Sequence, residues 1–166
     1  ASKPIAELIA QVGTRKRVDF VREFTEQVDG RTRFKRNKRT FDVEAEIAAR
    51  GPAYLAEYLE ALGERAPAHG ERWRAVDVAL RLAGNGSLGY TRLWLLVESG
   101  DHHRFVELKQ QGPPASAALL GDVELDPAER VVAGARALLG RPPFRLAPLP
   151  STPERVSFVG RRLRPE

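Results

Sequence analysis

A change in hydrophobic periodicity near residue 70 most strongly constrains how this chain can fold. Beyond it, apolar and polar residues alternate in segments 76–83, 91–99 and 103–109, which are joined by short glycine-containing links. Alternation with a period of two residues is typical of strands, and short links join strands that run antiparallel. The sequence therefore predicts a three-stranded antiparallel meander in this part of the chain.

One helix is predicted after the meander. Asp126 precedes Pro127 and stands three residues before Glu129, a pattern that favours a helix N-terminus with a capping box. Gly140 ends this helix, because glycine is favoured just beyond the last helical residue. The predicted apolar face comprises Val131, Val132, Ala135, Leu138 and Leu139.

Two more strands complete the expected sheet. The segments "FRLAPL" (144–149) and "RVSFVGRRL" (155–163) flank the turn "PSTPE" and are predicted as strands. Residues 71–166 are therefore expected to form the α+β part of the molecule, an antiparallel five-stranded sheet with one packed helix.

Residues 1–70 are predicted as a helical region that precedes the sheet. An apolar face runs through residues 5–12, and a second helix is expected from residue 14 until Gly30, with Val18, Val21, Phe24 and Val28 on its apolar side. Asp42 is expected to cap a short helix. A further helix is expected from Gly51 to Gly63, and we interpret its apolar stripe as core: Tyr54, Leu55, Tyr58, Leu59 and Leu62.

Composition excludes several classes of protein. The 166 residues include no cysteine, so disulfides and thiolate chemistry are excluded and a cytoplasmic location is expected. No apolar run approaches the roughly 20 residues that span a bilayer, so no membrane partner is expected. His102 and His103 follow Asp101, but adjacent residues on a strand point to opposite faces. A solvated turn is therefore favoured over a metal site.

The net charge of +5 is concentrated in one segment. Residues 31–39, "RTRFKRNKR", carry six cations and no acid, with Phe34 inside the run. Such a run is expected to be extended or an irregular hairpin, and it is compatible with binding an acidic protein or nucleic acid. A solvated surface segment is the favoured interpretation. Replacing Arg33, Lys35, Arg36 and Lys38 by glutamine is then expected to leave thermal stability nearly unchanged.

Three glycines at the spacing G-x-G-x-x-G lie between the first two strands of the meander. Gly84, Gly86 and Gly89 cannot form a dinucleotide-binding fingerprint, because a strand and not a helix follows them. A glycine-rich hairpin followed by a lysine on a strand is the arrangement of protein kinases, in which the glycine backbone approaches phosphates closely. The sequence alternative is a glycine-rich turn with an incidental lysine.

These positions define a candidate nucleotide site. Backbone N–H groups of the three glycines would cover the phosphates, Asn85 and Ser87 would add polar contacts, and Lys109 would supply the cation. Glu129, at the start of the predicted helix, is the candidate partner of Lys109. Glu124 is a weaker candidate, and we interpret Arg92 and Arg104 as solvated strand residues.

From about Asp77 onward the sequence resembles a bacterial family catalogued as domain of unknown function 2252. The likeness is carried by "DVALRLAGNGSLGYTRLWLLVES", "FVELKQ", "ERVVAGARAL" and "FVGRRLRPE". The resemblance implies a fold related to kinase-like and aminoglycoside-phosphotransferase-like proteins, with the sheet as a kinase amino-terminal lobe, and it implies ATP and Mg as ligands. The acid-rich motifs G-D-x-H-x-x-N and N-D-F-D of such proteins are not found in this sequence.

The expected function is therefore nucleotide binding as one lobe of a kinase-like phosphotransferase. Since the acids that hold magnesium and position a nucleophile are not found, no catalytic residue is assigned and no catalysis is expected from this segment alone. The absence of methionine and the start at Ala1 indicate a piece of a longer polypeptide, whose remainder would be a partner. Two alternatives stay open: a non-enzymatic module that binds through residues 31–39, and a purely structural lobe.

Overall fold

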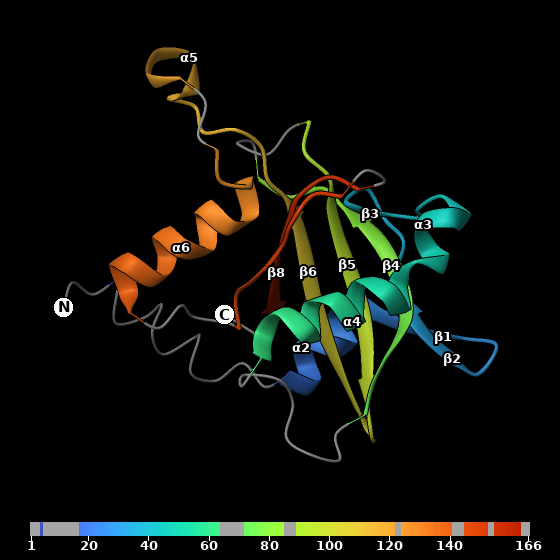
Figure 1. The fold of residues 1–166 in the computed structure, drawn as a ribbon. Coiled ribbons are helices and arrows are strands. Elements are labelled where there is room, and N and C mark those ends of the chain that lie inside the picture. Colours follow the sequence, from blue (N-terminus) through green and yellow to red (C-terminus); the bar gives the residue numbers. More distant parts are fainter. Residues whose placement is uncertain are drawn as a thin grey trace.

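The computed structural model describes residues 4, 17–63, 72–84, 89–121, 124–140, 145–152 and 155–163. Its centre is a six-stranded antiparallel sheet in the order β3-β4-β5-β6-β8-β7 (Figure 1). The strands are β3 (Thr40–Phe41), β4 (Trp73–Arg81), β5 (Arg92–Ser99), β6 (His102–Gln110), β7 (Ala147–Leu149) and β8 (Phe158–Leu163). The predicted antiparallel α+β class is confirmed. The five-strand count is one short, because β3 pairs with β4 at the edge of the sheet.

The meander β4-β5-β6 forms as predicted. Each pair is antiparallel, and β5 places Leu93, Leu95 and Val97 on one face while Trp94 and Leu96 lie on the other. One detail of β4 differs from expectation, since the register shifts between Ala75 and Asp77. This irregularity sends Val76 to the face opposite Val78, so the two valines do not share a face.

Helix α4 (Gly51–Leu62) covers the face of the sheet that carries Leu93, Leu95 and Leu108, here called the α4 face. The helix begins and ends where the sequence predicts, with a proline in its first turn and Gly63 at its C-cap. The residues Tyr54, Leu55, Tyr58 and Leu62 are buried, which confirms that the aromatic stripe is core.

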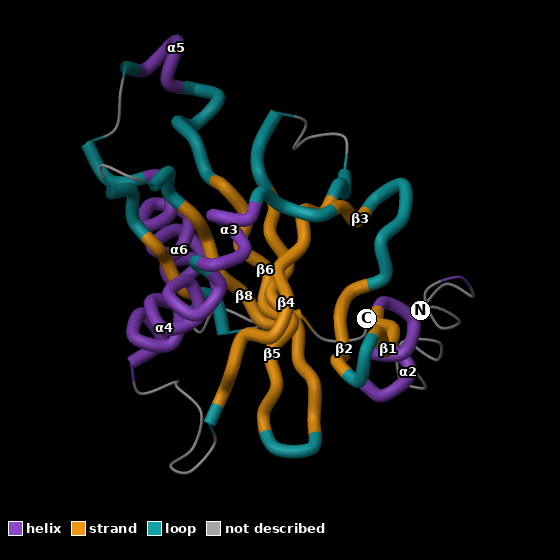
Figure 2. Tube along the Cα trace, turned by 90° about the vertical axis from the view of Figure 1, so that its right-hand side faces the viewer, coloured by secondary structure: helices purple, strands orange, loops and turns teal. Residues whose placement is uncertain are grey.

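The opposite face, here called the hairpin face, carries Trp94, Leu96 and Phe105 and is covered by the first described segment. This segment consists of helix α2 (Arg17–Phe24) and the two-stranded hairpin β1 (Thr25–Val28) and β2 (Arg31–Phe34). Figure 2 shows α4 on one side of the sheet and α2 with the hairpin on the other. The central strands of the sheet therefore lie between α4 on one face and α2 with the hairpin on the other.

The prediction that a helix continues to Gly30 is wrong. The helix ends at Phe24, and Val28 pairs with Arg31 across a two-residue turn. Asp29 and Gly30 have φ angles of 50° and 73°, as the tight turn of a two-residue hairpin requires. The β1–β2 hairpin begins before the basic segment and was not predicted, whereas residues 31–34 are extended, one of the two forms expected for that segment. The description of the first 63 residues as helical is not confirmed. Residues 5–12 lie outside the described residues.

The cap assigned to Asp42 is also wrong. The N-cap of α3 (Ala45–Ala49) is Glu44, which makes no side-chain capping bond. The Asp42 carboxylate instead accepts a hydrogen bond of 2.7 Å from Nε of Arg36. The Asp42 carboxylate therefore binds the guanidinium of Arg36 and does not cap the helix.

Helix α6 (Pro127–Leu139) begins as predicted. The Asp126 carboxylate accepts hydrogen bonds from the backbone N–H groups of Ala128 and Glu129, and also from Ser151 and Ser157. Although burial opposes ionisation, these hydrogen bonds hold the pKa of Asp126 down to about 2. Only the first half of the predicted apolar face is covered, since Leu138 and Leu139 are 86% and 62% exposed.

The contact between β8 and α4 requires a glycine. A Cβ added at Gly160 would lie 2.5 Å from Cδ2 of Tyr58 and 3.1 Å from Cδ1 of Leu149. The Tyr58 ring is fully buried and cannot withdraw, because its hydroxyl donates a 2.7 Å hydrogen bond to the Arg145 carbonyl. We expect Gly160→Ala to lower the free energy of unfolding by about 1–3 kcal/mol, measured by urea denaturation.

The matched control is Gly134→Ala in α6. An added Cβ there meets nothing within 4 Å, and alanine favours the helix. This variant should raise the free energy of unfolding by about 0.5–1 kcal/mol. Equal effects of the two alanines would show that the Tyr58 contact does not limit residue 160.

Candidate functional site

The glycine-containing connection joins β4 to β5 as predicted. Gly84 and Gly89 have φ angles of 76° and 88°, a region that residues with a side chain rarely adopt. Asn85, Gly86 and Ser87 lie outside the described residues. Because β4 and β5 are antiparallel neighbours, the connection is a hairpin loop and not a strand-to-helix turn.

Three cationic residues stand side by side at the base of this connection. Arg92 of β5 lies opposite Lys109 of β6, and Leu80 of β4 lies opposite Leu93. The same register places Arg81 opposite Arg92. Opposed residues of an antiparallel pair share a face, so Arg81, Arg92 and Lys109 form a row across three strands on the hairpin face, here called the cation row.

The cation row is electrostatically unfavourable by itself. Like charges directly opposite each other on a sheet destabilise it. Burial, followed by the charges of Arg39 and Arg92, lowers the pKa of Arg81. Such a row is suited to an anion that would bridge the cations.

One buried carboxylate lies beside the row. Glu107 is 1% exposed, and its Oε1 accepts hydrogen bonds of 2.8 Å from Nε of Arg161 on β8. Its Oε2 accepts from Nε1 of Trp94 at 3.0 Å and from Nη1 of Arg92 at 3.3 Å. Glu107 therefore fixes two guanidinium groups and the indole in one network across β5, β6 and β8.

Arg81 is held by an aromatic ring and a hydroxyl. Its guanidinium lies 4.6 Å from the centre of the Trp94 ring, and Nη1 donates a 2.8 Å hydrogen bond to Oγ1 of Thr40. Its Nε is buried and has no hydrogen-bond partner within the described ranges. Arg81 thus retains a donor that no other described residue uses.

The prediction that Arg92 is a solvated strand residue is wrong. Its side chain is 14% exposed and forms an ion pair with Glu107. Arg104 is half-buried, with its guanidinium 5.2 Å from the centre of the Trp73 ring. The alternation of apolar and polar residues predicts which face a side chain lies on. It does not predict whether a polar side chain on that face contacts a partner on a neighbouring strand.

The helix that carries Glu129, the predicted partner of Lys109, packs on the face of the sheet that carries Lys109. Lys109 is opposite Val159 of β8, and Val159 packs against Ala128 and Val132 of α6. Helix α6 therefore covers the hairpin face beyond β6, and Glu129 lies in its first turn. Across the described ranges, no ion pair joins Lys109 to Glu129, and Glu124 is exposed.

The basic segment 31–39 is not the uniform solvated run that the sequence indicates. Phe34 is fully buried, and its ring lies 5.0 Å from that of Phe105. Arg36 has a side-chain exposure of 22% and binds both Asp42 and Asp77. The assignment to the solvated surface is wrong for Arg36, and we now expect its replacement to lower stability, because the half-buried Asp77 carboxylate would lose its cation.

His102 and His103 begin β6, where they pair with Ser99 and Glu98. His102 is exposed and His103 is half-buried. In the part of the chain that the structure describes, no group of three or more histidine, aspartate or glutamate residues is arranged to hold a metal ion. None of the described helices is long and apolar enough to cross a membrane.

The comparisons assign the chain to a family. The model for a family of uncharacterized proteins conserved in bacteria, domain of unknown function 2252, matches residues 1–166. The chain belongs to this family. The match also includes the first 76 residues, which lie before the segments that carry the likeness in the sequence. No curated protein and no solved structure matches the chain.

Proposed function

We propose that this chain is the nucleotide-binding lobe of a kinase-like phosphotransferase. The observation that carries the proposal is the cation row, which stands at the base of a glycine-containing hairpin loop. Phosphate groups of a nucleotide would lie between the loop backbone and the three cations. Guanidinium and ammonium groups stabilise phosphate oxygens by charge-assisted hydrogen bonds.

The order of the elements supports the same proposal. Three antiparallel strands, the short helix α5 (Ala117–Leu120), helix α6 and two more strands follow one another, and Lys109 lies near the end of the third strand. Glu129, in the first turn of α6, is the residue that we propose as the partner of Lys109. Glu107 acts as a positioning residue, because it forms ion pairs with Arg92 of the cation row and with Arg161 beside it.

Magnesium is implied by the resemblance alone. The described residues offer no cluster of acids that fits a metal ion, and we assign no step to it. We assign no base, no magnesium ligand and no phosphoryl acceptor to the described residues. The proposal for this chain is therefore binding of the nucleotide and positioning of its phosphates.

We expect ATP to bind with a dissociation constant on the order of millimolar, or about 4 kcal/mol, since one lobe buries only part of a nucleotide. Lys109→Ala should weaken binding about tenfold or more, because a charge-assisted contact to phosphate is lost. A titration of the ¹⁵N-labelled protein followed by NMR would measure both affinities.

The matched control is Lys38→Ala, which removes the same charge from an exposed position in the basic segment. It should change the affinity for ATP less than twofold, because a single exposed charge contributes little to the interaction. Equal losses in the two variants, or unchanged binding in Lys109→Ala, would overturn the assignment of the phosphate site.

A further inference from the structure

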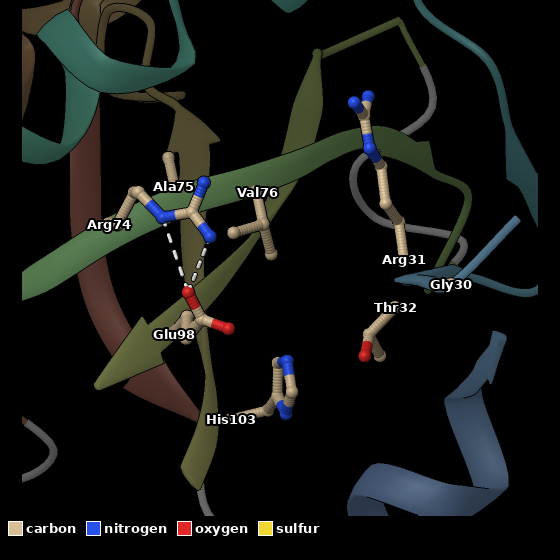
Figure 3. Close-up of a pocket in the computed structure, with 8 residues that line it drawn as sticks. All are labelled: Gly30, Arg31, Thr32, Arg74, Ala75, Val76, Glu98 and His103. Carbon is tan, nitrogen blue, oxygen red and sulfur yellow. Dashed lines mark hydrogen bonds and ion pairs between the residues drawn. The ribbon is translucent and has the colours of Figure 1, made fainter. Parts of the chain in front are cut away.

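A polar cavity lies between the β1–β2 hairpin and strands β4, β5 and β6, at the end of these strands away from the cation row. Its volume is about 380 Å³, within the range of small-ligand sites. Figure 3 shows residues from both sides of it, with Glu98 and His103 facing Thr32 across the cavity. The lining residues are Gly30, Arg31, Thr32, Arg74, Ala75, Val76, Glu98 and His103.

The cavity carries an excess of hydrogen-bond donors. Its one carboxylate, Glu98, already accepts hydrogen bonds of 2.6 and 3.2 Å from Arg74. Arg31 is exposed and forms no ion pair with another described residue. His103 stands opposite Glu98 in the β5–β6 register and adds an imidazole N–H. Arg31 and His103 are therefore available to an incoming anion.

The Thr32 hydroxyl completes the donor set. Its oxygen accepts a 2.7 Å hydrogen bond from Nε2 of Gln27, so its own hydrogen is left to donate elsewhere. Val76 supplies an apolar side chain on β4 beside these donors. A ligand with an oxyanion at one end and a short carbon skeleton at the other matches this lining.

We propose that this cavity binds a small oxyanion, the carboxylate or phosphate group of a small organic molecule. Arg31, whose guanidinium points away from His103 and Thr32 in Figure 3, would turn toward the anion to form a forked pair, and His103 and Thr32 would each donate one hydrogen bond. The site is separate from the cation row. Arg74 and Arg81 lie at opposite ends of β4, about 20 Å apart at the usual rise of a strand.

The test uses the whole 166-residue chain and two probes, inorganic phosphate and succinate, titrated by NMR with sodium chloride at matched ionic strength. At least one probe should give saturable shifts confined to the amides around the cavity, including Gly30, Thr32 and His103. Arg31→Gln should weaken that binding about tenfold, as expected for a lost charge-assisted bond. Saturation by phosphate alone assigns a phosphate ester, and saturation by succinate alone assigns a carboxylate.

The control is Arg33→Gln, which removes the same charge from the same strand. Arg33 does not line the cavity and pairs with Glu26 at 2.9 Å, so binding should change less than twofold. His103→Gln gives a second test if Arg31→Gln does not fold. Failure of both probes to saturate, equal shifts with sodium chloride, or equal loss in Arg33→Gln would overturn the proposal. None of these outcomes depends on ATP binding at Lys109.

Discussion

Replacing Glu107 by alanine is expected to lower the free energy of unfolding by about 3–5 kcal/mol, because removing one partner of a buried ion pair leaves the other uncompensated. The carboxylate is the only described acceptor that joins Arg92, Arg161 and the Trp94 indole. In a protein of this length, such a loss lowers the melting temperature by roughly 6–20 °C. Urea denaturation and calorimetry would measure both quantities.

Glu98→Ala is the matched control for this prediction. Glu98 is on the neighbouring strand and also pairs with an arginine, but the side chain of that partner, Arg74, is 73% exposed. An exposed ion pair is worth about 0–1 kcal/mol, so this variant should unfold at nearly the temperature of the unmodified protein. Similar losses in both variants would contradict the structural role assigned to Glu107.

Replacing Phe34 by alanine should cost about 3–5 kcal/mol of unfolding free energy, the usual loss for a buried phenylalanine. Its ring is fully buried and lies 5.8 Å from Trp94 and 5.0 Å from Phe105. The loss would open a space between the hairpin and the sheet. Urea denaturation followed by tryptophan fluorescence would report it, because Trp94 borders that space.

Phe41→Ala gives the comparison for Phe34, because Phe41 lies on the edge strand β3 and is 39% exposed. Its replacement should cost less than about 1.5 kcal/mol, since much of its apolar surface already meets water. If Phe34→Ala were equally mild, the ring would be free to stack on a base. The interpretation of residues 31–39 as a nucleic-acid-binding segment would then regain support.

Local patterns in the sequence were sufficient for the parts of the fold that depend on neighbours along the chain. The period of two residues predicted β5 and β6 and the two faces of β5. Pro127 and Asp126 marked the start of α6, and Gly63 marked the end of α4. In each case the signal is a backbone preference or a capping bond within a few residues.

The β1–β2 hairpin was missed because two local signals compete there. Val18, Val21 and Val28 fit a helical spacing, whereas Asp29 and Gly30 are the residue types of a tight hairpin turn. Asp29 and Gly30 are by themselves sufficient to indicate the hairpin turn, and the helical spacing of the valines is coincidental. Burial of Phe34 against the sheet is a tertiary contact, and it is what stabilises the strand.

The sequence by itself determined the residues of the glycine spacing and the lysine that follows on the third strand. Tertiary structure alone decided that Arg81 and Arg92 stand in a row with Lys109, and that Glu107 joins β5 to β8. The register of a sheet sets which charges become neighbours, and it depends on packing along the whole length of the strands. A linear spacing carries no such information, so the cation row emerges only when the strands are paired.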